Sequence, residues 1–200
     1  MKVLASGDIH GDSSLAEKLA ATAADKKVDL VVLCGDLGNM QDVPKNVLGP
    51  FAKRKQKVLI IPGNHDSFAT ADFLAEVYGA TNLHGYTAVY DGIGFFGCGG
   101  ANIGMEQLPE DEIFHILKKG FEKVKRYGKK ILVSHVHPTG VKMEQFSSFV
   151  PGSRGLRRAI DELKPDLVLC SHVHEASGIE EKVGTTSVIN VSRDARILDL

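Results

Sequence analysis

The segment KVLASGDIHGD, residues 2–12, combines a strand-like run with the polar groups of a binding site. Residues 2–6 are mostly apolar without strict alternation, a pattern typical of a parallel strand covered on both faces. Gly7 ends this run, and Asp8 and His10 follow it directly. In open α/β sheets the carboxyl ends of the strands form the edge where ligands bind. The segment therefore predicts a strand that delivers Asp8 and His10 to such an edge.

The same combination occurs four more times along the chain. Strand-like apolar runs span residues 29–34, 57–61, 130–134 and 166–171. They lead, in that order, into Gly35-Asp36, Gly63-Asn64-His65-Asp66, His135-Val136-His137 and His172-Val173-His174. We expect these polar residues to converge on one place, because the carboxyl ends of parallel strands share one edge.

Helical patterns lie between these strands. They predict helices over residues 14–25, from Asp66 or Ser67 to about 78, 109–127 and 153–163. Ser14 with Glu17 resembles a capping box at the start of the first helix. Either Asp66 or Ser67 caps the second. The order of strand, helix and strand indicates an α/β fold.

Two regions interrupt the alternation of strands and helices. Residues 86–90 and 93–98 flank Asp91-Gly92 and are typical of a hairpin. The chain then ends in three short strand-like runs without a helix, over residues 179–183, 186–191 and 196–200. These regions favour a mixed arrangement, such as two packed sheets with helices outside.

Length and charge narrow the class of protein. The 200 residues suit one domain, expected over 1–200. The net charge of -1 gives no general attraction to nucleic acid or to a membrane surface, and the chain contains no apolar run long enough for a membrane span or a signal peptide. Three cysteines without a CxxC spacing argue against a disulfide framework or a thiolate zinc site, so we expect a cytoplasmic protein.

The polar residues at the strand ends have the chemistry of metal ligands. They combine oxygen and imidazole donors without thiolates, which suits Mn, Fe or Zn. The seven candidates are Asp8, His10, Asp36, Asn64, His135, His172 and His174. Seven are too many for one ion with open positions, but they suit two ions that share a carboxylate. Two-metal sites of this kind activate a water for in-line displacement at phosphorus.

In this order, Asp8-x-His10, Gly35-Asp36, Gly63-Asn64-His65-Asp66, His135 and His172-x-His174 resemble the motifs of the calcineurin-like metallophosphoesterases. Residues 131–175 resemble the small prokaryotic members of that family. The resemblance implies a four-layer α-β-β-α sandwich of two mixed sheets. It assigns one metal to Asp8, His10, Asp36 and His174. It assigns the second to Asp36, Asn64, His135 and His172, with Asp36 bridging.

The resemblance also implies an activity. We expect two divalent ions, Mn first and Fe, Zn or Ni as alternatives, and phosphodiester hydrolysis by a hydroxide that bridges them. His65 is the expected general acid. The expected substrate is a small phosphoester, without nucleic acid or membrane. The alternatives are a phosphomonoesterase of the same mechanism, a metal-bound binding scaffold without catalysis, and a nuclease that needs a partner or an added domain.

Two residues depart from the family pattern. Asn39 stands where many members have an aspartate that supports the acid histidine, which leaves open what orients His65. Ser171 replaces the glycine that usually precedes the last His-x-His.

Other residues are placed by their position in loops. Arg154 lies near the site or in solvent, and His137 is interpreted as a loop residue rather than a substrate contact. The glycine-rich residues 97–102, with Met105 and residues 136–150, are expected to wall the substrate cleft.

Overall fold

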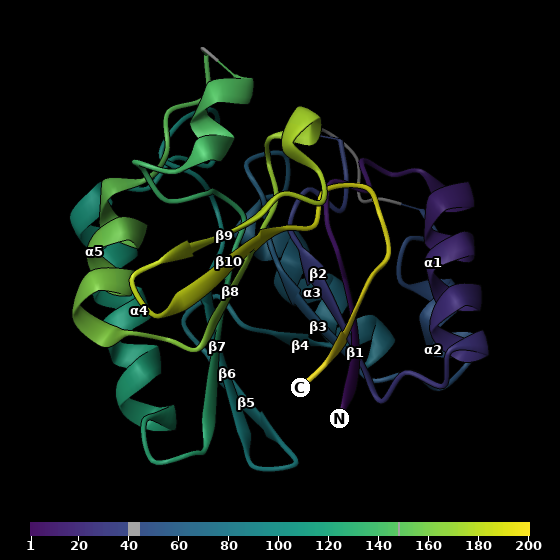
Figure 1. Ribbon diagram of the computed structural model, residues 1–200. Helices are drawn as coiled ribbons and strands as arrows, with labels where there is room; N and C mark the ends of the chain where they lie inside the picture. The colour runs from purple at the N-terminus through teal and green to yellow at the C-terminus, as the bar shows by residue number, and fades with distance from the viewer. Residues whose placement is uncertain (40–44, 148) are drawn as a thin grey trace.

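The strands form two mixed sheets, as Figure 1 shows for the computed structural model, which describes residues 1–39, 45–147 and 149–200. The first sheet has the order β11-β1-β2-β3-β4 and the second β5-β6-β7-β8-β10-β9. In the first, β11 (Arg196–Asp199) is antiparallel to its neighbour, and the parallel strands are β1 (Lys2–Ser6), β2 (Leu30–Cys34), β3 (Val58–Ile61) and β4 (Thr81–Asn82).

In the second sheet the edge strands β5 (Thr87–Tyr90) and β9 (Glu180–Val183) are antiparallel to their neighbours. The parallel strands are β6 (Ile93–Cys98), β7 (Lys129–Ser134), β8 (Leu167–Cys170) and β10 (Thr186–Asn190).

Helices cover the outer face of each sheet and complete four layers (Figure 1). On the first sheet lie α1 (Ser13–Asp25), α2 (Gly49–Lys53) and α3 (Phe68–Tyr78), and on the second lie α4 (Glu110–Val124) and α5 (Arg154–Leu163). The predicted α-β-β-α sandwich of mixed sheets is therefore confirmed.

The continuous apolarity of the strands follows from burial on both faces. In β1, Val3 and Ala5 belong to the core between the two sheets, whereas Leu4 packs under the helices. β2 alternates in the same way, with Val32 facing the other sheet and Val31 facing the helices. Successive side chains of a strand point to opposite faces, so a strand in the middle of four layers has no polar face.

The helix starts correct one detail of the sequence prediction and decide between two alternatives for another. Asp12, rather than Ser14, is the N-cap of α1: its carboxylate accepts hydrogen bonds from the backbone N–H groups of Ser14 and Leu15, at 3.0 Å each. The predicted capping box is therefore wrong, and Glu17 pairs instead with Arg54. Ser67 caps α3 by accepting from the N–H of Thr70.

Some short elements were not predicted, and one helix ends early. α4 ends at Val124, three residues before the predicted end. The two-residue strand β4, the five-residue α2 and the 3-10 turns η1 (Lys142–Phe146) and η2 (His174–Ala176) had no periodic signal. Among the described residues, no helix combines the length and apolarity needed to cross a membrane.

Candidate metal centre

The loops after β1 and β2 hold their polar residues in an unusual backbone conformation. Asp8, His10 and Asp36 have φ angles of 54, 49 and 50°, and His172, after β8, has 75°. L-residues rarely adopt this left-handed region, and such strain concentrates at functional sites. Hydrogen bonds maintain it, since the N–H of Asp8 bonds the carbonyl of Gly35 at 3.0 Å and that of His10 bonds the carbonyl of Asp36 at 2.8 Å.

Two glycines allow the strand ends to approach one another. A Cβ atom on Gly35 would lie 2.6 Å from Nδ1 of His135 and 2.9 Å from Cα of Gly63. A Cβ atom on Gly63 would overlap the carboxylate and backbone nitrogen of Asp36. These contacts explain why glycine precedes both Asp36 and Asn64, since only a residue without a side chain fits between three crowded loops.

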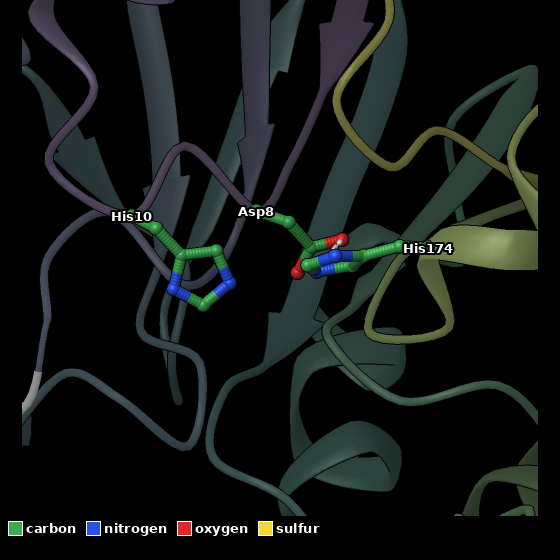
Figure 2. Close-up of side chains that lie close together, drawn as sticks. All are labelled: Asp8, His10 and His174. Atoms are coloured by element: carbon green, nitrogen blue, oxygen red, sulfur yellow. Dashed lines mark ion pairs between the residues drawn. The ribbon is translucent and has the colours of Figure 1, made fainter.

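The candidate ligands form two clusters. The outer cluster consists of Asp8, His10 and His174, and the inner cluster of Asp36, His135 and His172. In each cluster, one possible ligand atom per residue lies within 4.8 Å of the others. Figure 2 shows the side chains of Asp8, His10 and His174 close together, with the Asp8 carboxylate against the ring of His174; Nε2 of His174 lies 3.7 Å from Oδ2 of Asp8.

The Asp36 carboxylate lies between the two clusters. Its Oδ2 atom is 3.6 Å from Nε2 of His10 and 3.4 Å from Nε2 of His135. Asn64 completes the inner cluster, because its Oδ1 is 2.9 Å from the same Nε2 of His135. All seven predicted ligands are thus brought together, and one carboxylate oxygen faces histidines of both groups.

The charges of the inner cluster are strongly coupled. Burial opposes the charged form of His135, but the carboxylates of Asp36 and Asp8 outweigh it and raise the pKa of His135 to about 9. Burial likewise opposes ionisation of Asp36, yet His135 and the N–H of His65 keep its pKa below the ordinary value. Without a cation, the cluster therefore holds a proton on His135 beside an ionised Asp36.

His172 differs from its neighbour. Burial, together with the charge of His135, lowers the pKa of His172 to about 3, so its ring is neutral. Its Nε2 atom is buried and makes no hydrogen bond to any described residue. A buried nitrogen with a free lone pair needs a partner, and a metal ion supplies one.

The outer cluster is stabilised by an ion pair that reaches solvent. Burial opposes ionisation of Asp8, but its contacts with His174 and His135 lower the pKa of its carboxyl group. The contact with Asp8 in turn raises the pKa of His174. The side chain of His174 is 42% exposed, whereas that of Asp8 is fully buried. The outer cluster therefore lies at the mouth of the site.

In His135 and His10, a hydrogen bond at Nδ1 leaves Nε2 as the nitrogen that can bind a metal. Nδ1 of His135 lies 3.0 Å from the carbonyl oxygen of Cys34 and 3.0 Å from Oγ of Ser171. The Ser171 hydroxyl donates to that same carbonyl at 2.5 Å, so both oxygens can accept from Nδ1–H. This leaves Nε2 of His135 directed at Asn64 and Asp36, the arrangement that orients metal-bound histidines.

Asn39 performs the same task for His10. Its Oδ1 is 3.1 Å from Nδ1 of His10, and its Nδ2 donates to the carbonyl of His10 at 2.8 Å. Asn39, which departs from the family pattern, therefore orients the candidate ligand His10 and not His65. The ring of His65 packs edge-on against the ring of His10, with centroids 5.0 Å apart. Among the described residues no hydrogen bond to the His65 ring was found, so this edge contact is what the structure offers to orient it.

Two further residues support the site: Asp66, which belongs to the sequence motif but had no settled role, and Arg193, which was not predicted. Asp66 is buried and accepts the N–H groups of Leu37, Gly38 and Gly63 at 2.9, 2.7 and 3.0 Å, which joins the loops after β2 and β3. Of the two predicted caps of α3, the structure therefore selects Ser67 and not Asp66. Arg193 donates from Nη1 to the carbonyl of Asp8 at 3.2 Å. The position of Asp66 next to His65 in the sequence was a signal for a role at the site. No sequence pattern indicated such a role for Arg193.

An open pocket of about 310 Å³ lies over both clusters. It is lined by His10, Asp36, His65, Ser147, Val150, His172, His174 and Glu175. Arg154 is not among these residues and is exposed at the first turn of α5. His137 lies in the loop after β7, as interpreted, and is not among the residues that line the pocket. Its side chain is fully buried, and its ring nitrogens have no hydrogen-bond partner among the described residues.

Comparisons with known proteins agree with this geometry. Residues 1–176 match the family model of the calcineurin-like phosphoesterases. No curated protein sequence matches the chain. Among solved structures, TT1561 of Thermus thermophilus is similar over 99% of this chain and 98% of its own, with a TM-score of 0.79 and 20% identity.

Two other structures share the fold. A dimetal phosphatase from Danio rerio is 9% identical over 95% of this chain and 86% of its own, with a TM-score of 0.58. A novel archaeal phosphodiesterase is 18% identical over 95% of this chain and 82% of its own, with a TM-score of 0.52. At these identities the likenesses establish the fold alone. The family match over most of the sequence establishes more: the chain belongs to the calcineurin-like phosphoesterases and is a metal-dependent phosphoesterase.

Proposed function

We propose that residues 1–200 act as one catalytic domain in the cytoplasm, hydrolysing phosphodiesters with two divalent ions, Mn(II) in the first place. The observation that carries this proposal is the position of Asp36, whose Oδ2 faces a histidine of each cluster at 3.6 and 3.4 Å. A shared carboxylate between two such groups is the arrangement that holds two ions side by side.

The donors fit hard or borderline divalent ions. Asp8, His10, Asp36 and His174 would hold the ion of the outer cluster. Asp36, Asn64, His135 and His172 would hold the ion of the inner cluster, where the free Nε2 of His172 needs a partner. When bound, the ions lower the pKa of a water and neutralise charge on the phosphoryl oxygens.

The charge of the pocket favours a diester over a monoester. A diester carries one negative charge at neutral pH, whereas a monoester carries close to two. Among the described residues that line the pocket there is no lysine or arginine, and Glu175 adds a negative charge. A second charge on the substrate would therefore be paired only by the two ions and the histidines.

His65 has the position expected of a general acid. Its ring lines the pocket, and its backbone N–H donates to Oδ1 of Asp36 at 2.9 Å, which places it beside the shared carboxylate. The leaving alkoxide of a diester departs far more readily when it is protonated. In this proposal His65 gives its ring proton to that oxygen, while His10, packed against it, limits the rotation of the ring.

The direct test is hydrolysis of bis-p-nitrophenyl phosphate and of p-nitrophenyl phosphate by Mn(II)-loaded protein. We expect the diester to be preferred, and His65→Asn to lower kcat by about 10²–10⁴-fold. His115→Asn is the matched control, because His115 is an exposed histidine on α4. Preference for the monoester would reverse the substrate assignment. Metal binding without hydrolysis of either ester would support a binding scaffold instead.

A further inference from the structure

Exposed apolar side chains are concentrated on two loops beside the pocket. Among the described residues, eight large apolar side chains are exposed. Four of them lie on two loops, with Ile103 and Met105 in residues 101–107 and Phe146 and Phe149 in residues 141–150. Phe149 is 85% exposed and Phe146 47%. Half of these side chains therefore occupy fewer than a tenth of the residues, and such clusters mark binding sites.

Both loops contact the candidate metal centre. Ser147 and Val150 line the pocket together with His65. On the other loop, the backbone of Gly104 packs on Asn64, since a Cβ atom there would lie 3.1 Å from its Nδ2. The loops are also joined to each other, because Nδ2 of Asn102 donates to the carbonyl of Pro151 at 3.2 Å. The two loops that carry the apolar side chains thus border the place where a phosphoryl group would bind.

Residues 141–147 of the second loop are held in place by hydrogen bonds and by one buried side chain. Glu144 accepts hydrogen bonds from the hydroxyl of Thr139 at 2.9 Å and from the N–H groups of Gly140 and Gly152 at 2.7 and 3.0 Å. Met143 is fully buried in the core between the second sheet and its helices. These contacts hold the segment before Phe146 and the residue Gly152 after the loop, so Phe146 is presented to solvent next to a preorganised backbone.

The charge of these loops limits what they can bind. The charged residues of the two loops are Glu106, Lys142 and Glu144, whereas residues 101–105 and 145–150, which carry the four apolar side chains, contain none. The one acidic residue lining the pocket besides Asp36, Glu175, comes from another part of the chain. An uncharged apolar group would bury exposed surface against these side chains, whereas residues 101–105 and 145–150 offer no cation to a polyanion such as a nucleic acid.

We propose that Ile103, Met105, Phe146 and Phe149 form an apolar subsite that takes an uncharged aryl or alkyl ester group of the substrate. This inference rests on the proposed function and deepens it, because it names the substrate class as phosphodiesters with one apolar organic group. The phosphoryl group would lie at the metal centre, and the apolar group would extend outward between the two loops.

The test varies one ester group and keeps the leaving group constant. Methyl, phenyl and octyl p-nitrophenyl phosphates are compared by kcat/KM on Mn(II)-loaded protein, and the phenyl and octyl arms separate aromatic from aliphatic preference. We expect one of these two to exceed the methyl ester by about tenfold. Phe146→Ser combined with Phe149→Ser should reduce this advantage to about twofold. Phe73→Ser, at a 51% exposed position on α3, should keep it.

Binding provides a second readout without turnover. Octylphosphonate, phenylphosphonate and methylphosphonate are titrated into the Mn(II)-loaded protein by calorimetry, and the expected order of affinity follows the kinetic order. Hydrolysis of the methyl diester without any preference for the larger esters would overturn the subsite and leave the proposed function standing. If no diester is hydrolysed, the proposed function fails, and equal affinities for the three phosphonates would then overturn the subsite as well.

Discussion

The two candidate metal clusters are built from similar residues in different surroundings. In the inner cluster, Asp36 and His135 are almost completely buried. The outer cluster has a buried Asp8, but the side chains of His10 and His174 are 20% and 42% exposed. Two of the three inner ligands are therefore shielded from solvent, whereas two of the three outer ligands reach solvent at the mouth of the pocket.

This difference in burial allows one site to combine rigidly held ligands with access for water and substrate. A buried cluster can be preorganised, because its nitrogens and oxygens are fixed by internal hydrogen bonds. An exposed cluster leaves room for water and for a substrate oxygen, as an open catalytic position requires. We therefore expect the inner ion to bind more tightly than the outer ion, with Asp36 connecting the two.

The largest expected effect comes from breaking that connection. Asp36→Asn keeps the shape of the side chain but removes the charge that faces both histidines, and should lower kcat/KM by about 10³-fold or more. Metal analysis should show loss of at least one ion per chain. Asp91→Asn, in the exposed turn between β5 and β6, is the matched control. Two tightly bound ions in Asp36→Asn protein would contradict a bridging role.

The two clusters should also differ in how much a ligand contributes to the free energy of unfolding. His135→Ala leaves the Asp36 carboxylate buried without its partner, and we expect a loss of about 3–5 kcal/mol in the unfolding free energy of the metal-free protein. His174→Ala removes a half-exposed ring and should cost about 1 kcal/mol or less. Urea unfolding at neutral pH measures both. Equal losses would show that the two clusters do not differ in their coupling to the core.

The supporting hydrogen bonds should give a smaller and selective effect. Ser171→Ala removes one of the two oxygens at Nδ1 of His135, and should weaken the inner ion by about tenfold. Asn39→Ala removes the partner of His10 and should weaken the outer ion by a similar factor. Competition with a chelator resolves the two affinities. Both variants weakening the same ion would contradict the assignment of these residues to separate clusters.

Proton release gives the smallest and most specific signal. With a pKa of about 9, His135 is protonated at pH 8 in the metal-free protein, and a metal ion must displace that proton. We expect about one proton to leave the inner cluster per ion bound at pH 8, falling toward zero above pH 10. Calorimetric titration in buffers of different ionisation enthalpy measures it, and His135→Ala removes it. A constant release across this range would contradict the coupled pair.

Much of the fold could be predicted because its signals are local. The continuous apolar runs identified the buried strands to within one residue at most ends, because a strand that is buried on both faces is apolar at successive positions. The N-cap of α5 at Ser153 was likewise visible in the sequence. The cap of α1 was not, because Asp12 and Ser14 are equally good capping residues and only the path of the loop after β1 decides between them.

The candidate ligands could also be selected from sequence, because carboxylate, amide and imidazole side chains recur directly after strands. Their supports could not. Asp66 acts through three backbone N–H groups from two loops, and Ser171 acts on His135 across 36 residues of sequence. Such contacts depend on how loops meet in space, and no periodicity or local motif encodes them.

The central claim is that two ions share Asp36, and anomalous diffraction from crystals grown with excess Mn(II) tests it most directly. We expect two anomalous peaks about 3.5–4 Å apart, both in contact with the Asp36 carboxylate. Asn64, His135 and His172 should surround one peak, and Asp8, His10 and His174 the other. A single peak, or two peaks that do not share Asp36, would contradict a bridging role of Asp36 between two ions.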